Sequence, residues 1–199
     1  MNLPDEYRTP TLEDLAWALA RIPRWNGQTI APWSVAQHCI TGAMLYPNRD
    51  ESTIDRLYFM LHDAEEMFTG DTPKPYKTPE QDDLSREIRR DIFENLAKLP
   101  YPEHEPWHHM DQVLAAAESK LLASPERRQL VELDCQIDDW IEVERAMEVV
   151  WRLQGMSVDD VAGRFVDLAG SLLFSEPAAL LRSPLIVMSS GNEEVHWSW

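Results

Sequence analysis

One short stretch of the chain, LHDAEEMFTGDTPKPYK at residues 61–77, groups the residue types that bind divalent cations. His62 and Asp63 are adjacent, and Glu66 follows one helical turn after His62. A neutral imidazole beside a carboxylate suits Zn, Mn, Co or Fe. Adjacent helical side chains point about 100° apart, so both reach one cation only if it lies between their directions. Alone the pair is a weak indication, because acidic runs usually form solvated surfaces.

Two other segments carry residues with the same chemistry. His38 lies in SVAQHCITGAML, and Asp111 opens DQVLAAAESKLL. Each has a simpler interpretation: a single helical histidine is more often a hydrogen-bonded core residue, and an acid in the first turn complements the helix dipole. Prolines interrupt the segment with His104, His108 and His109, so we expect these three on the surface.

Helical spacing of apolar residues predicts the elements that position these side chains. It begins in TLEDLAWALARI, and further helices are expected at about 34–46, 52–68, 82–98, 107–122, 126–153 and 157–174. Helix-start signals are Ser34, Ser52, Ser157 and Pro125-Glu126. Only PLIVMSS at 184–190 could be a strand, so we predict an all-α fold.

The 199 residues suit a single domain, 1–199, with a core at about 12–174. Proline-rich breaks at 71–79 and 99–106 are expected to be loops between helices rather than domain linkers. Residues 175–199 form a C-terminal extension that includes Trp197 and Trp199. These tryptophans would pack on the domain or on a second subunit, unless the extension is a disordered tail.

The charge and the cysteines limit the setting and the partners. The formal net charge is −17, which argues against nucleic acid and anionic membrane as partners. Cys39 and Cys135 are the only cysteines, and MNLPDEYRTPTLEDL has no signal-peptide pattern. No apolar run has the roughly 20 residues of a membrane span. A reduced, cytoplasmic setting is the simplest expectation.

As a set, His38, His62-Asp63 and Asp111 resemble the H…HD…D signature of the HD-domain phosphohydrolases. LHDAEEMFTGDTPKPYK is similar to the HD-A-x-E-x-x-x-G-D-x-P-x-P-x-K segment of one branch, which contains YfbR-type 5′-deoxynucleotidases and DatZ-like phage dATP triphosphohydrolases. Upstream, Arg24-Trp25 and the SVAQH of Ser34 to His38 resemble the Arg-aromatic pair and the S-V-x-x-H helix start of that branch. The resemblance covers about residues 12–120; Gln37 departs from it, and residues beyond 125 have no counterpart.

The resemblance implies a role for each residue of the motif within an HD-domain helical bundle. One divalent ion (Zn, Co, Mn or Fe) would be held by His38, His62, Asp63 and Asp111, and a second such as Mg could lie at the phosphates. Proton transfer would fall to Glu66 and Asp71. Phosphate would be bound by Arg24, Lys74 and Lys77. Trp25 would stack on the base or bound the sugar pocket, unless it packs in the core, and we expect Glu65 to face solvent.

The implied activity is hydrolysis of a small deoxynucleotide. The favoured reaction is that of a dATP-type dNTP triphosphohydrolase, which releases deoxynucleoside and triphosphate. The first alternative is a 5′-deoxynucleotidase that removes phosphate from dNMPs. The second is a non-catalytic HD module that binds nucleotide or metal. By analogy with relatives the chain is expected to form a homo-oligomer.

Overall fold

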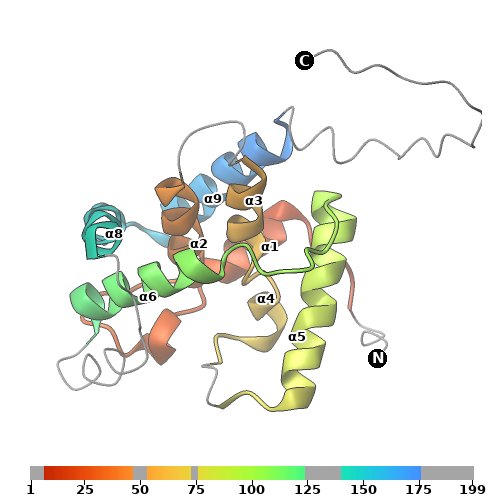
Figure 1. Ribbon diagram of the computed structural model, residues 1–199, viewed down its shortest axis with the longest axis horizontal. Helices are drawn as coiled ribbons and strands as arrows, with labels where there is room; N and C mark the ends of the chain where they lie inside the picture. The colour runs from red at the N-terminus through yellow and green to blue at the C-terminus, as the bar shows by residue number, and fades with distance from the viewer. Residues whose placement is uncertain (1–6, 47–52, 73–75, 124–139, 176–199) are drawn as a thin grey trace, which may run out of the picture.

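The computed structural model describes residues 7–46, 53–72, 76–123 and 140–175, and every regular element in these ranges is a helix (Figure 1). The predicted all-α fold is therefore confirmed. Several predictions lie outside the described residues: the strand-like 184–190, the helix starts at Ser52 and Pro125-Glu126, and the roles of Lys74, Trp197 and Trp199.

Side-chain capping sets the start of three helices close to the predicted positions. Helix α2 (Val35–Leu45) begins after Ser34, whose hydroxyl accepts the Gln37 backbone N–H in a capping box. Helix α9 (Val158–Leu173) begins after Ser157 in the same manner. Helix α1 (Leu12–Leu19) has a Thr11 cap.

Helix α3 (Thr53–Leu61) and helix α4 (Glu66–Thr69) replace the single helix predicted at 52–68. That prediction was wrong because the chain turns at residues 62–65. The imidazole Nδ1 of His62 lies 2.7 Å from the Phe59 carbonyl oxygen, a position from which its N–H takes that acceptor. The turn then continues with tighter i to i+3 backbone bonds, such as that from Ala64 N–H to Leu61.

The second half of the bundle follows the predicted order. Helix α5 (Pro79–Asp91) begins three residues earlier than expected, with a Thr78 capping box, and passes into a π-helical turn, η4 (Ile92–Ala97). Helix α6 (His108–Leu122) agrees with the prediction, and α8 (Trp140–Leu153) is the described part of the expected 126–153 helix.

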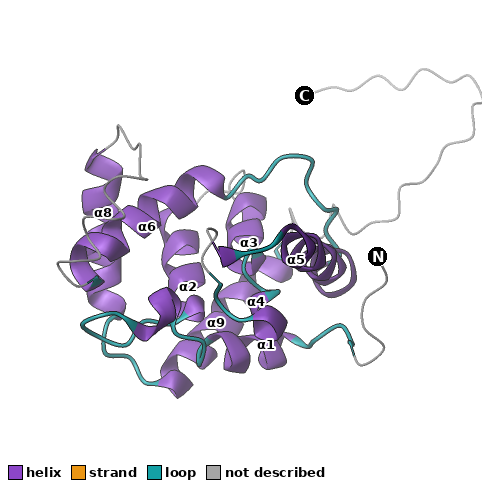
Figure 2. Ribbon diagram, turned by 90° about the horizontal axis from the view of Figure 1, so that it is seen from below, coloured by secondary structure: helices purple, strands orange, loops and turns teal. Residues whose placement is uncertain are grey.

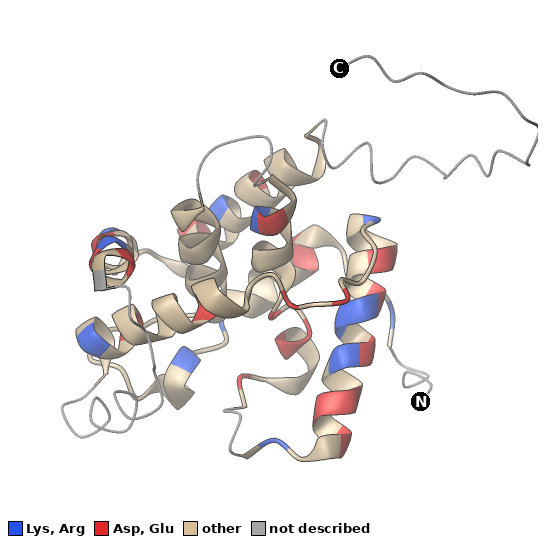
Figure 3. Cartoon of the chain, viewed as in Figure 1, with Lys and Arg blue, Asp and Glu red and all other residues tan. Residues whose placement is uncertain are grey.

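Helix α2 is the centre of the bundle. It packs against α1, α3, α6, α8 and α9, and all its residues except Met44 are buried (Figure 2). It carries no Asp, Glu, Lys or Arg, whereas acidic and basic residues are interspersed along α5 (Figure 3). Because α2 is enclosed by other helices, a polar side chain on it must find its partners inside the protein. In the described ranges no helix is long and apolar enough to span a bilayer.

Candidate metal centre

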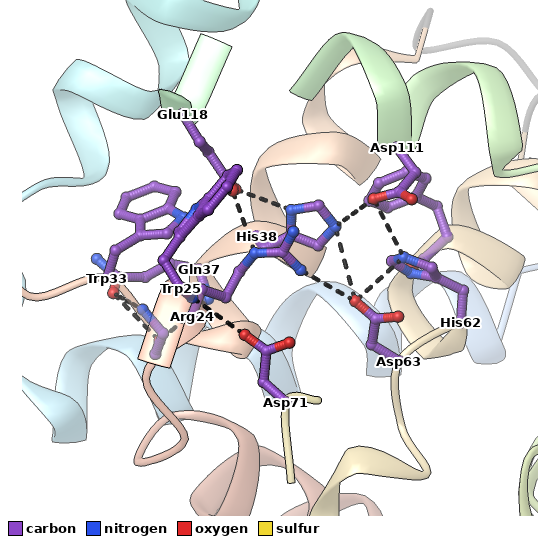
Figure 4. A network of polar contacts seen from close by, with 12 residues as sticks. Arg24, Trp25, Trp33, Gln37, His38, His62, Asp63, Asp71, Asp111 and Glu118 are labelled. Atoms are coloured by element: carbon purple, nitrogen blue, oxygen red, sulfur yellow. Dashed lines mark hydrogen bonds and ion pairs between the residues drawn. The ribbon is translucent and has the colours of Figure 1, made fainter. Parts of the chain in front are cut away.

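The four residues with the HD-like spacing converge on one point inside the bundle. His38 comes from α2, His62 and Asp63 from the turn after α3, and Asp111 from the first turn of α6 (Figure 4). The Nε2 atom of His38 lies 3.2 Å from Asp111 Oδ1 and 3.7 Å from Asp63 Oδ2. The Nε2 atom of His62 lies 3.2 Å from Asp63 Oδ2 and 3.9 Å from Asp111 Oδ1.

Both imidazoles present an unpartnered nitrogen to this point. The two Nε2 atoms are buried and have no hydrogen-bond partner among the described residues. Their Nδ1 atoms are engaged, at 2.8 Å from Glu118 Oε1 for His38 and at 2.7 Å from the Phe59 carbonyl oxygen for His62. Since a neutral imidazole donates from one nitrogen and accepts at the other, these contacts direct both Nε2 lone pairs inward. Two imidazole nitrogens beside two carboxylates fit a divalent ion such as Zn²⁺.

Cys39 is a weaker candidate ligand. Its Sγ atom lies within 4.8 Å of ligand atoms of His62 and Asp63. Burial raises the pKa of the thiol well above its usual value, and the nearby Asp63 carboxylate raises it further. The thiolate that metals bind is therefore disfavoured at this position.

The centre has paired charges when it holds no cation. Burial and Arg24 lower the pKa of His38, but Glu118 and Asp111 outweigh them and raise that pKa to about 9. Burial acts to raise the pKa of Asp111, but His38 and His62 hold it well below its usual value. The metal-free centre therefore holds a proton on His38 near neutral pH, and a cation that binds there must displace it.

The two acids expected to handle protons lie beside the centre. Glu66 is 5% exposed, and its Oε2 has no hydrogen-bond partner among the described residues. Burial, together with the Asp63, Asp71 and Glu65 carboxylates, raises the pKa of Glu66 well above its usual value. Burial likewise raises the pKa of Asp71, which accepts the backbone N–H of Trp25 at 3.1 Å. Both acids therefore titrate above the range of exposed carboxylates.

Arg24 and Trp25 lie beside Asp71, in the short helix η1 (Arg24–Gly27) (Figure 4). The Arg24 guanidinium contacts two acids, with Nε at 3.1 Å from Glu118 and Nη1 at 3.3 Å from Asp63. Burial would lower its pKa, but these acids raise it, so the side chain stays charged. Trp25 has a left-handed backbone (φ 58°) and a half-buried ring, so it is not a core residue.

A cavity of about 370 Å³ opens onto the centre. Its lining includes Arg24 and Trp25 of η1, Lys77 of the loop before α5, and Arg86 and Arg89 of α5. The cavity thus brings together all the predicted site residues except the buried His38 and Lys74, which lies outside the described residues.

Two acids behave differently from the sequence prediction. Glu65 was expected to face solvent, which is wrong: it is 0% exposed and accepts two hydrogen bonds from the Arg89 guanidinium, one of them at 3.1 Å from Nε. The turn at 62–65 points it toward α5. Glu118, also 0% exposed, was not predicted as a site residue at all. Its position in the apolar AAAES segment was the available signal, because an acid buried among alanines needs partners.

The predicted surface position of three histidines is confirmed. His104, His108 and His109 are exposed, although His108 also borders the cavity at the start of α6. His109 Nε2 lies 2.8 Å from the carboxylate of Glu142 on α8, away from the centre.

Comparison with known proteins finds similar chains among curated proteins and among solved structures. No family model matches. An uncharacterized protein of Rhodobacter capsulatus is 33% identical over 122 residues, which cover 56% of this chain and 62% of that protein. The chain thus matches less than two thirds of its relative's length.

One similar solved structure is the cyanophage S-2L HD phosphohydrolase DatZ, bound to dA and one catalytic Zn²⁺ ion. It is 23% identical, with a TM-score of 0.49, and the match covers 83% of this chain and 97% of that chain. The case for a metal centre in this chain rests on its own geometry.

Proposed function

We propose that the protein is an HD-type, metal-dependent phosphohydrolase that acts on deoxynucleotides. The observation that carries the proposal is the pair of buried, unpartnered Nε2 atoms of His38 and His62, which face the carboxylates of Asp63 and Asp111. Such a set holds a cation, and it opens onto a cavity with placed cationic side chains.

The division of labour follows from the surroundings of each side chain. A divalent ion held by the four residues would lower the pKa of a coordinated water toward neutrality and neutralise charge on the attacked phosphate. Glu66, whose pKa is raised by burial, suits a group that accepts and holds a proton more readily than an exposed carboxylate does. Asp71 is the second proton-handling group. Arg24 stays charged and, with Lys77, would bind phosphate oxygens.

Within this class, we propose a dNTP triphosphohydrolase with dATP as the favoured substrate. Trp25 would bound the nucleoside, and Lys77 and Arg86, which line the same cavity, would be cationic contacts for phosphates beyond the first. The volume of about 370 Å³ lies in the ordinary range of ligand pockets. The preference for adenine rests on the sequence resemblance alone. A second ion such as Mg and a homo-oligomer also rest on the resemblance alone. The cytoplasmic location stays a prediction.

A product analysis tests the proposal. Each dNMP and dNTP is incubated with the protein and Co²⁺ or Mn²⁺, and the products are separated by chromatography. We expect triphosphate and deoxynucleoside from a dNTP, and no product with Asp63→Ala. Asp167→Ala is the matched control, since it removes an exposed carboxylate of α9 that does not line the cavity.

Each other outcome identifies an alternative. Orthophosphate from dNMPs alone would identify a 5′-deoxynucleotidase. Nucleotide binding without any hydrolysis by the wild-type protein would overturn the enzyme proposal in favour of a binding module.

A further inference from the structure

We infer that Glu118 is a positioning residue that holds the metal ligand His38 and the phosphate-binding Arg24 with Trp25 in one arrangement. The inference builds on the proposed function and assigns a role to a residue beyond the H…HD…D motif. Glu118 would not touch the reacting atoms. It would act through the side chains that do.

Glu118 accepts from four different side chains (Figure 4). Its Oε1 takes the Trp33 indole N–H at 2.8 Å and lies 2.8 Å from His38 Nδ1. Its Oε2 takes Arg24 Nε–H and the Trp25 indole N–H, both at 3.1 Å. A carboxylate has about four lone-pair sites, so one side chain satisfies all four donors.

Only an ionised carboxylate can make this set of contacts. The Oε2 atom of Glu118 lies 3.1 Å from Nε of the charged Arg24 guanidinium, which pairs with a carboxylate in its ionised form. A glutamine of the same shape would place its NH₂ group against one pair of donors, either those of His38 and Trp33 or those of Arg24 and Trp25. Buried donors without an acceptor are costly, so the side chains would move apart.

The contact with His38 decides which nitrogen is available to a metal. With Nδ1–H donated to Glu118, the lone pair of His38 lies on Nε2, 3.2 Å from Asp111 Oδ1. Without that acceptor, the ring loses both its preferred tautomer and its orientation. The same carboxylate, through Oε2, holds the Arg24 guanidinium with Nη1 at 3.3 Å from Asp63. Loss of Glu118 should therefore weaken both metal and phosphate binding.

The test compares Glu118→Gln with Trp33→Phe. Trp33 is 2% exposed, donates to the same oxygen and does not line the cavity at the centre, so its substitution removes one bond of Glu118 and some packing. Co²⁺ affinity is measured by competition with a chromogenic chelator, together with the visible Co²⁺ spectrum. For Glu118→Gln we expect roughly a 10- to 100-fold loss of affinity and an altered spectrum. For Trp33→Phe we expect a lower Tm with affinity and spectrum unchanged.

A purely structural role would give a different result. If Glu118→Gln binds Co²⁺ as tightly as the wild type and differs only in Tm, the inference is overturned. Because this readout needs no turnover, it stands apart from the proposed function, which fails if the wild-type protein hydrolyses no nucleotide. Where hydrolysis is seen, KM for the nucleotide should rise in Glu118→Gln and stay unchanged in Trp33→Phe.

A second measurement covers the case in which Glu118→Gln does not fold. The wild-type protein, labelled with ¹⁵N-histidine and loaded with ¹¹³Cd²⁺, should show metal–nitrogen coupling at His38 Nε2 and a proton on Nδ1. Coupling at Nδ1 would refute the proposed direction of the ring.

Discussion

The contact of Gly42 on α2 with the Phe59 ring on α3 makes Gly42→Ala a sharp test of how the core supports the candidate metal centre. A Cβ atom on Gly42 would lie 1.9 Å from Cε1 of Phe59, where ordinary contact begins at 3.4 Å. The ring would have to move by about 1.5 Å to restore van der Waals contact. Phe59 is 0% exposed and its ring centroid lies 5.6 Å from that of His38 and 4.5 Å from that of His62, so it moves only by displacing the ligands.

Overpacking of a core typically costs about 1–3 kcal/mol. Because the shift exceeds what a rotamer change absorbs in a close-packed interior, we expect the free energy of unfolding to fall by about 3 kcal/mol, the upper end of this range. For a protein of this size each 1 kcal/mol lowers Tm by roughly 2–4 °C, so the expected loss is about 6–12 °C. Co²⁺ affinity should fall as well, because both imidazoles move.

The assay pairs thermal unfolding with metal competition, and Gly163→Ala is the matched control. Gly163 lies in α9, is exposed, and a Cβ there meets nothing within 4 Å. Removal of its backbone freedom in a helix should stabilise the protein by about 0.5–1 kcal/mol and leave metal affinity unchanged. If Gly42→Ala keeps the wild-type Tm and Co²⁺ affinity, the argued contact between core and centre is wrong. A partial recovery in Gly42→Ala/Phe59→Leu would support it.

Three further perturbations test separate contacts. Arg89→Ala leaves Glu65 buried without its partner and should destabilise the protein by about 3–5 kcal/mol in urea unfolding; Arg89→Ala/Glu65→Gln should recover part of this, and no recovery would contradict the pairing. Thr78→Ala removes the α5 cap and should cost about 1 kcal/mol, with unchanged metal binding as the control. In metal-free protein, the pKa of His38 is raised to about 9, so His38 stabilises the fold at pH values below its unfolded pKa of 6.5, and this stability is lost as the pH rises through 9. The pKa of Glu118 is lowered, so Glu118 stabilises the fold at pH values above its unfolded pKa of 4.5, and this stability is lost as the pH falls into the acid range. Stability measured with EDTA should therefore fall between pH 6.5 and 9, and a flat profile there would refute the His38–Glu118 pairing.

Local signals explain which parts of the fold were predictable. The starts of α2 and α9 follow from Ser34 and Ser157, whose capping bonds involve residues only three positions away. The break between α3 and α4 did not follow, because it depends on a bond between the His62 ring and the Phe59 carbonyl that apolar periodicity does not report. The early start of α5 was visible in principle, since Thr78 and Gln81 form a capping box.

The site shows the same limit at longer range. The candidate metal ligands were selected by their resemblance to the H…HD…D signature, because residue type alone left simpler interpretations for His38 and Asp111, and the structure brings the four together. Glu118 could not be assigned, because its partner Arg24 lies 94 positions away in the sequence. Glu65 was assigned to the surface because a continuous helix through residue 65 would point it outward, whereas the turn buries it against Arg89. The partners of a buried acid are set by tertiary contacts, and they cannot be read from the spacing of residues within one helix.

The charges around the centre indicate that a cation belongs there. Glu65 has Arg89, and Glu118 has Arg24, so each of these buried acids has its own guanidinium. Asp111, in contrast, has no Lys or Arg within ion-pair distance among the described residues and faces only imidazole nitrogens. A neutral histidine does not compensate a carboxylate, so either His38 keeps a proton or a metal ion takes its place. A divalent metal ion would supply more positive charge than the proton that it displaces. The chain as a whole is negative and repels anions, but the acids of the centre would hold a cation that attracts a phosphate to this one position.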